Sequence, residues 1–122
     1  MVPCFRMTRR LRGRAELSAA AALEPCADLI GLASDWRAAG RVYHLPYGSL
    51  VGRVSNLLAA GRCVSVGDDL WDATRAIPVC ALTGEAAGAA AALGVAAGID
   101  PAAIDVRELQ KALRERGGIL SL

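Results

Sequence analysis

The sequence predicts an α/β fold in which a short helix and short strands come first and two longer helices follow. Segments 27–34 and 41–47 are rich in residues that favour strands, whereas segment 79–97 is a long apolar run of helix-forming residues. The length of 122 residues allows one domain at most. About one residue in five is alanine, which buries little area, so we expect a thin core.

The overall charge is nearly balanced, at +2, which excludes a strongly basic nucleic-acid module. The first 14 residues do carry five arginines, but no aromatic residue beyond Phe5 lies among them to stack on bases. We therefore expect no nucleic-acid partner. The arginine-rich start is expected to be solvated or to face a substrate.

The cysteines offer little support for a metal site. None of the four forms a C-x-x-C pair, and the chain has one histidine, His44, for which we expect a structural role. No secretory signal is visible, so we expect reduced cysteines and a cytoplasmic location. Cys63 and Cys80 are flanked by apolar residues and are expected to be buried, inert thiols.

The first half of the chain predicts one helix and two strands. Residues 15–23 favour a helix with Ser18 as a possible N-cap, and Pro25 ends it. Strands are expected at 27–34 and 41–47, joined by a turn. Pro46 confines the second strand to a sheet edge or places it at a strand end.

The middle of the chain predicts a turn at 52–56 and then a buried strand. The apolar run at 57–60 is typical of a strand buried on both faces of a parallel sheet, and Gly61 ends it. Residues 65–76 are polar and are expected to form a loop. Its aspartates lack the ligand spacing of a calcium site, so we expect them to be solvated: Asp68, Asp69 and Asp72.

The last part of the chain predicts two helices. The first spans 79–97, with Gly98 at its C-terminus. The second starts at Asp105, with Glu108 at capping-box spacing and Gly117 after its end. Its apolar stripe is expected to consist of Val106, Leu109 and Leu113.

Small residues share one face of the 79–97 helix, since Gly84, Gly88 and Ala92 are four residues apart. Three interpretations stay open: a buried helix that crosses a sheet closely, a transmembrane helix with a small-residue dimer face, or a ligand-binding helix. Glu85 weighs against the membrane, because a charge at the bilayer centre is costly. In the third interpretation, the free N–H groups of the first turn face an anion or an electron-rich ring.

Several motifs together resemble the C-terminal end of FAD-dependent oxidoreductases of the glutathione-reductase-like branch. They are RMTRRLRG at 6–13, YHLPYGSLV at 43–51, NLLAAGRCVSV at 56–66, RAIPVCALTGEAAGAAAAL at 75–93 and DPAAIDVRELQKALRERGGIL at 100–120. The resemblance implies a partial, Rossmann-like FAD-binding domain with one buried strand and C-terminal helices, plus a few strands of a substrate-type sheet. The implied boundary separates a substrate-domain remnant at 1–55 from the C-terminal part of the FAD-binding domain at 56–122.

The resemblance also implies where FAD would lie. The end of the 56–61 strand runs beside the ribityl and pyrophosphate region, and a helix that begins around Thr83 points its N-terminus at the flavin ring. The implied cofactor-binding residues are Gly61, Arg62, Cys63, Thr83, Gly84, Glu85 and Ala86. This assignment expects Gly84 and Gly88 to be covered, with residues 56–61 in a sheet beside them. Arg75 either holds an anionic substrate group or is a loop arginine bonded to carbonyls.

The sequence departs from the family pattern in four places. No G-x-G-x-x-G fingerprint is present, Gly48 stands where a basic residue is usual, Met7 replaces an acid, and loop 65–74 lacks a histidine. The resemblance therefore implies only the last segment of a flavoenzyme, which binds FAD weakly or not at all by itself. No catalytic residue is assigned.

The sequence supports two hypotheses about the function of the chain. The first is the C-terminal segment of an FAD-dependent oxidoreductase that needs the missing N-terminal portion or a complementary chain. The second is a non-catalytic interaction module that self-associates or docks onto a partner. The Ala/Gly face and unpaired strand edges favour such contacts in either case.

Overall fold

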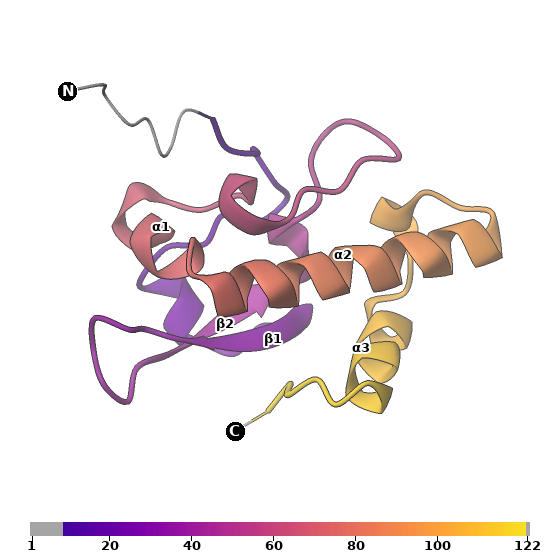
Figure 1. Ribbon diagram of the computed structural model, residues 1–122. Helices are drawn as coiled ribbons and strands as arrows, with labels where there is room; N and C mark the ends of the chain where they lie inside the picture. Colours follow the sequence, from indigo (N-terminus) through magenta and orange to yellow (C-terminus); the bar gives the residue numbers. More distant parts are fainter. Residues whose placement is uncertain (1–8, 122) are drawn as a thin grey trace.

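A computed structural model describes residues 9–121 (Figure 1). The expectations for Cys4, for Met7 and for the first residues of segment 6–13 fall outside this part. In chain order the elements are η1 (Ala21–Leu23), β1 (Leu29–Ser34), β2 (Val42–Pro46), η2 (Tyr47–Ser49), η3 (Gly61–Cys63), α1 (Asp68–Thr74), α2 (Ile77–Ala97), η4 (Pro101–Ala103) and α3 (Val106–Glu115).

The two predicted strands form an antiparallel hairpin, and Pro46 ends β2 as expected. A bulge between Leu29 and Gly31 interrupts the pairing. The connecting turn is held by the buried Asp35, whose carboxylate accepts hydrogen bonds from Arg37 Nε at 2.9 Å and from Tyr43 Oη at 2.7 Å. The described residues therefore combine helices with a small antiparallel sheet, which is compatible with a fragment of the predicted α/β class, and this two-stranded sheet is the only one among them.

Helix α2 runs across β1 and forms the long axis of the molecule (Figure 1). Gly31 of β1 makes this close crossing possible, because a Cβ at that position would collide with the side chain of Leu82. Helix α3 packs against both α2 and β1. One apolar cluster joins these elements, with Leu45 and Leu50 from the first half and Ala86, Ala90 and Leu109 from the second.

Both C-terminal helices match the sequence patterns that predict them. Gly98 adopts a left-handed φ of 65° at the end of α2, and its N–H bonds back to the last turn. Asp105 caps α3 by accepting a hydrogen bond from Arg107 N at 2.9 Å. Leu109 and Leu113 are buried and Val106 is half-buried, so the predicted stripe of α3 is confirmed.

Two predictions of local structure were wrong. Residues 15–23 form only the single turn η1, because Leu17 instead bridges to Val66 and is held there from both sides. The predicted loop at 65–76 contains helix α1. Its first turn carries Asp68 and Asp69, which favour a helix N-terminus, and its inner side buries Leu70.

The predicted buried strand at 57–60 was also wrong. Leu58 makes a single antiparallel bridge to Val51, and Leu57 is 51 % exposed. A strand buried on both faces needs parallel neighbours, and residues 9–121 contain none to flank this segment.

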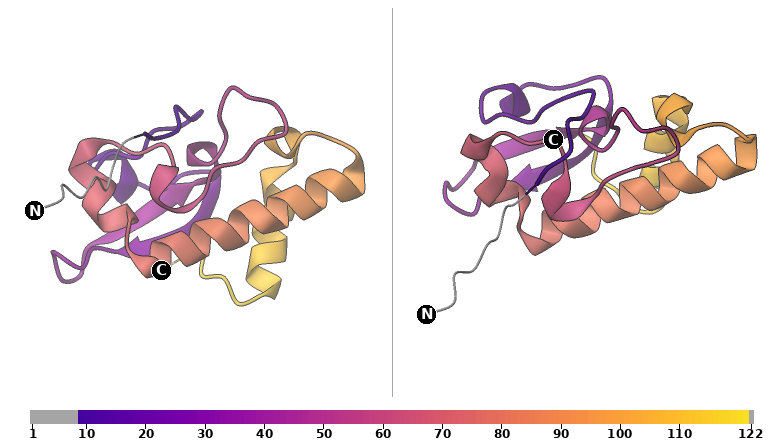
Figure 2. Two further views of the ribbon diagram at one scale, coloured as in Figure 1. Left: turned by 45° about the horizontal axis from the view of Figure 1, so that its top comes forward. Right: turned by 90° about the horizontal axis from the view of Figure 1, so that it is seen from above.

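Helix α2 is long and apolar enough to cross a membrane by length and composition. The core helix of a globular protein meets the same criterion, and α2 contacts β1 and α3. Seen from above, it lies along one edge of the molecule (Figure 2). Its exposed side includes Glu85 and, next to it, one stripe without charged residues: Ile77, Ala81, Gly84, Gly88, Ala91 and Val95. We call this set the open stripe.

Candidate functional site

The centre of the candidate site is the junction between η3 and α2. Gly61 N donates a hydrogen bond to Thr83 Oγ1 at 2.9 Å, and that hydroxyl donates to Val79 O at 2.8 Å. Gly61 has a left-handed φ of 71°, which favours glycine. Two segments that the resemblance assigns to the flavin, 22 residues apart in sequence, therefore meet directly.

The side chains of Arg62 and Cys63 lie on the surface beside this junction. The carbonyl of Arg62 accepts a hydrogen bond from Trp71 Nε1 at 3.4 Å, and the carbonyl of Cys63 accepts one from Leu11 N at 2.8 Å. Cys63 is exposed and Cys80 is half-buried, so the expectation of buried thiols was wrong. The short η3 turn presents Cys63 outward, although apolar residues follow it in sequence.

The helix does not begin at Thr83. Helix α2 begins at Ile77, and Pro78 occupies the first turn, where its missing N–H is tolerated. By Cys80 the amides already bond within the helix, since Cys80 N donates to Ala76 O at 3.0 Å. The amides of Gly84, Glu85 and Ala86 lie further along and are not free donors.

The expected cover of the glycine face is absent from the described part of the chain. A Cβ at Gly84 or at Gly88 would meet no atom within 4 Å. Residues 56–61 form no strand beside them, so this expectation was wrong for residues 9–121. Within residues 9–121, the open stripe is therefore free to be contacted by another chain or a ligand.

Arg75 is bound to its own helix. Its Nε donates to Asp72 Oδ1 at 2.8 Å, and its guanidinium lies 5.3 Å from the centre of the Trp71 ring. This arrangement matches neither of the two alternatives from sequence, because the partner is a carboxylate instead of a carbonyl or substrate. A substrate role for Arg75 stays a prediction, and it would require that ion pair to open or be shared.

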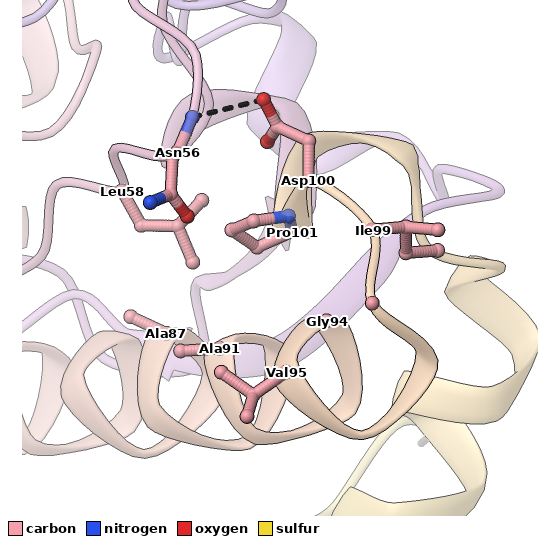
Figure 3. A pocket seen from close by; sticks show the side chains of 10 residues that line it. Asn56, Leu58, Ala87, Ala91, Gly94, Val95, Ile99, Asp100 and Pro101 are labelled. Carbon is pink, nitrogen blue, oxygen red and sulfur yellow. Dashed lines mark hydrogen bonds between the residues drawn. The ribbon is translucent and has the colours of Figure 1, made fainter.

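A pocket of about 600 Å³ lies over the second half of α2 (Figure 3). Its walls are mostly apolar and include Leu58, Ala87 and Ala91. At its rim the Asp100 carboxylate accepts hydrogen bonds from Asn56 N at 2.9 Å and from Ala102 N at 2.8 Å. These backbone donors lower the pKa of Asp100. None of the expected cofactor residues lines this pocket.

A smaller pocket brings Cys26, Asp28 and His44 together. Burial and the nearby Asp28 raise the pKa of the Cys26 thiol to about 11. His44 Nδ1 lies 3.3 Å from Ala22 O. A thiol with a raised pKa is mostly protonated at neutral pH and is therefore a poor nucleophile.

A third, polar cavity was missed by sequence reasoning because it depends on tertiary contacts. Arg10 and Arg12 reach it from the N-terminal segment, Arg53 from the 52–56 turn, and Ser65 from the segment after η3. The arginine-rich start is the only sequence signal for it.

The comparisons with known proteins identify the family. The family model for FAD dependent oxidoreductases matches residues 2–113. No curated protein and no solved structure gives a significant match. The chain therefore belongs to the FAD dependent oxidoreductase family, in which FAD carries the redox chemistry.

Proposed function

We propose that the chain is the C-terminal segment of a glutathione-reductase-like FAD oxidoreductase and contributes one side of the flavin site. The observation that carries this is the hydrogen bond from Gly61 to Thr83. It links the two motifs that the resemblance assigns to flavin contact, A-G-R-C and T-G-E-A-A-G, and the family match covers both of them.

Helix α2 begins at Ile77 and not around Thr83, and this earlier start changes the role that Gly84 and Glu85 can have. Because the amides of Gly84 and Glu85 are used within the helix, they offer no anion site. Gly84 and Gly88 instead provide a face without side chains, which a strand or a flat ring can approach closely. We propose that the N-terminal portion of the flavoenzyme, or a complementary chain, supplies the Rossmann-like strands that cover the open stripe.

Exposure of apolar side chains supports the need for such a cover. Ile77 is 83 % exposed and Val95 is 84 % exposed, at the two ends of the open stripe. The apolar pocket of Figure 3 continues this surface at Ala91 and Val95. Because the pocket and the open stripe share Ala91 and Val95, they form one continuous apolar surface, a feature that favours docking of a partner.

Titration of the purified chain with FAD tests the proposal. We expect no stoichiometric yellow complex at micromolar FAD, because the adenosine and most of the pyrophosphate site require the G-x-G-x-x-G portion. Addition of a separate chain that carries this portion is expected to restore bound flavin absorbance. Gly88→Leu should abolish the restoration, whereas Ala97→Leu, exposed on the same helix but off the open stripe, should not. A stoichiometric complex of the lone chain would refute the proposal.

The open stripe also favours a second function, a non-catalytic module that self-associates through α2. Sedimentation of the lone chain separates the two functions. A concentration-dependent dimer that Val95→Asp dissociates, together with no flavin binding after complementation, would favour the second function.

A further inference from the structure

We propose that Arg12, Arg53 and Ser65 form a binding site for a small oxyanion, a phosphate or a carboxylate. The three residues line a polar cavity of about 530 Å³, together with Arg10, Gly13 and Glu16. The cavity lies at the meeting of three chain segments and is separate from the pocket of Figure 3.

The first observation is a buried hydroxyl without a partner. Ser65 is 1 % exposed, and its Oγ is the one buried side-chain polar atom in residues 9–121 that makes no hydrogen bond. A buried hydroxyl left unpaired destabilises the fold, so its presence needs an explanation. An anion that reached this hydroxyl would accept its hydrogen bond and remove that cost, which requires a local opening of the lining, because the Oγ is closed to solvent.

The second observation is the positive charge along the same cavity, where Arg12 and Arg53 are exposed side chains. Arg10 is already bound to Asp68 at 2.6 Å and lies 4.0 Å from Glu16. Arg12 and Arg53 have no carboxylate within 4.0 Å in the described part of the chain. Two guanidinium groups therefore remain to donate to an oxyanion, for which their planar geometry is well suited.

The backbone holds this cavity in place. Leu11 N donates to Cys63 O at 2.8 Å, Leu17 N donates to Ser65 O at 3.0 Å, and Arg14 N donates to Val51 O at 2.9 Å. Gly13 packs so closely that a Cβ there would lie 2.8 Å from the Cβ of Ser65. The backbone of the arginine segment is thus fixed against the Ser65 segment.

The oxyanion site lies close in sequence to the segment that is assigned to the flavin, which suggests a role in substrate binding. Cys63, in the segment assigned to the flavin, is two residues before Ser65. The oxyanion would then be the charged group of the flavoenzyme's substrate. This extension rests on the proposed function, whereas the binding site itself does not.

Calorimetric titration of the full chain, without flavin, tests the site with inorganic phosphate and with succinate at constant ionic strength. Saturable binding of either probe is expected, and the stronger one identifies the anion class. Arg12→Gln and Arg53→Gln should each weaken that binding about tenfold, since each removes a charged hydrogen bond. Arg116→Gln makes the same charge change on an exposed residue at the end of α3 and should leave affinity unchanged.

Ser65→Ala distinguishes a built site from a general basic surface. It should weaken binding of the probe severalfold, while the melting temperature without anion stays equal or rises, because the unpaired hydroxyl is gone. Absence of saturable binding by both probes would overturn the proposal, as would binding of only a long polyanion such as heparin. Equal effects of Arg53→Gln and Arg116→Gln would also overturn it. Because no flavin is used, these outcomes are independent of the FAD titration.

Discussion

The hydrogen bond between Gly61 and Thr83 can be tested by removing the hydroxyl that accepts it. Thr83 is 1 % exposed, and valine has nearly the same shape. In Thr83→Val the Gly61 N–H, half-buried in η3, loses its acceptor. An unpaired buried donor costs about 1–3 kcal/mol, and partial exposure of Gly61 favours the lower half of that range. For a chain of this size we expect the melting temperature to fall by about 3–8 °C.

Thr74→Val is the matched control. Thr74 is buried to a similar extent on α1, and its hydroxyl only donates to Trp71 O at 3.2 Å. That carbonyl also accepts Arg75 N at 3.0 Å, so removal of the hydroxyl leaves no group unpaired. We expect the free energy of unfolding of this variant to change by less than about 0.5 kcal/mol.

Urea unfolding gives the free energy of unfolding of each variant, and hydrogen exchange of the Gly61 amide reports whether that amide keeps its hydrogen bond. The amide should exchange faster in Thr83→Val and keep its protection in Thr83→Ser, which retains the hydroxyl. If Thr83→Val and Thr74→Val are equally stable and Gly61 exchanges as in the parent chain, the hydrogen bond does not join η3 to α2.

Two further predictions concern α2 and the hairpin. Gly94→Ala should destabilise the chain, because its Cβ would lie 3.0 Å from Ile99 O and 3.2 Å from the Pro101 backbone. Gly88→Ala should stabilise the chain by about 0.5–1 kcal/mol, since open space surrounds that position. Thermal melts of the two variants check this, and equal shifts in melting temperature would contradict the packing described for Gly94. The hydrogen bonds from Arg37 lower the pKa of Asp35 below its usual value, so Asp35 stabilises the fold above about pH 4 and that contribution is lost as the pH falls below it. Melting temperatures from pH 7 to pH 2 should therefore fall less steeply for Asp35→Asn, and parallel curves would refute this.

Local patterns were sufficient where a segment's structure depends on its own residues. The hairpin follows from strand-forming residues on either side of a turn, and α3 follows from its Asp105 cap and its stripe of Leu109 and Leu113. The end of α2 follows from Gly98. In these places the cap, the turn and the apolar pattern that define each element lie within a few residues of one another, so they can be recognised in the sequence.

The candidate site was only partly predictable. The family motifs placed Gly61 and Thr83 in one site, and their hydrogen bond agrees with that grouping. No sequence pattern could show that the open stripe lacks cover, or that Asn56 N reaches Asp100. Each of these depends on a contact, or a missing contact, between distant segments.

By itself the sequence determined the mixture of strands and helices, the β1–β2 hairpin, the two C-terminal helices, and the motifs that place the chain among FAD dependent oxidoreductases.

Only the tertiary structure decided which apolar residues are buried. Residues 57–60 read as a buried strand, yet they find no parallel neighbours in residues 9–121, whereas the polar 65–76 segment forms a helix because Leu70 reaches the core. Burial depends on what lies opposite a residue, and that is a property of the folded chain.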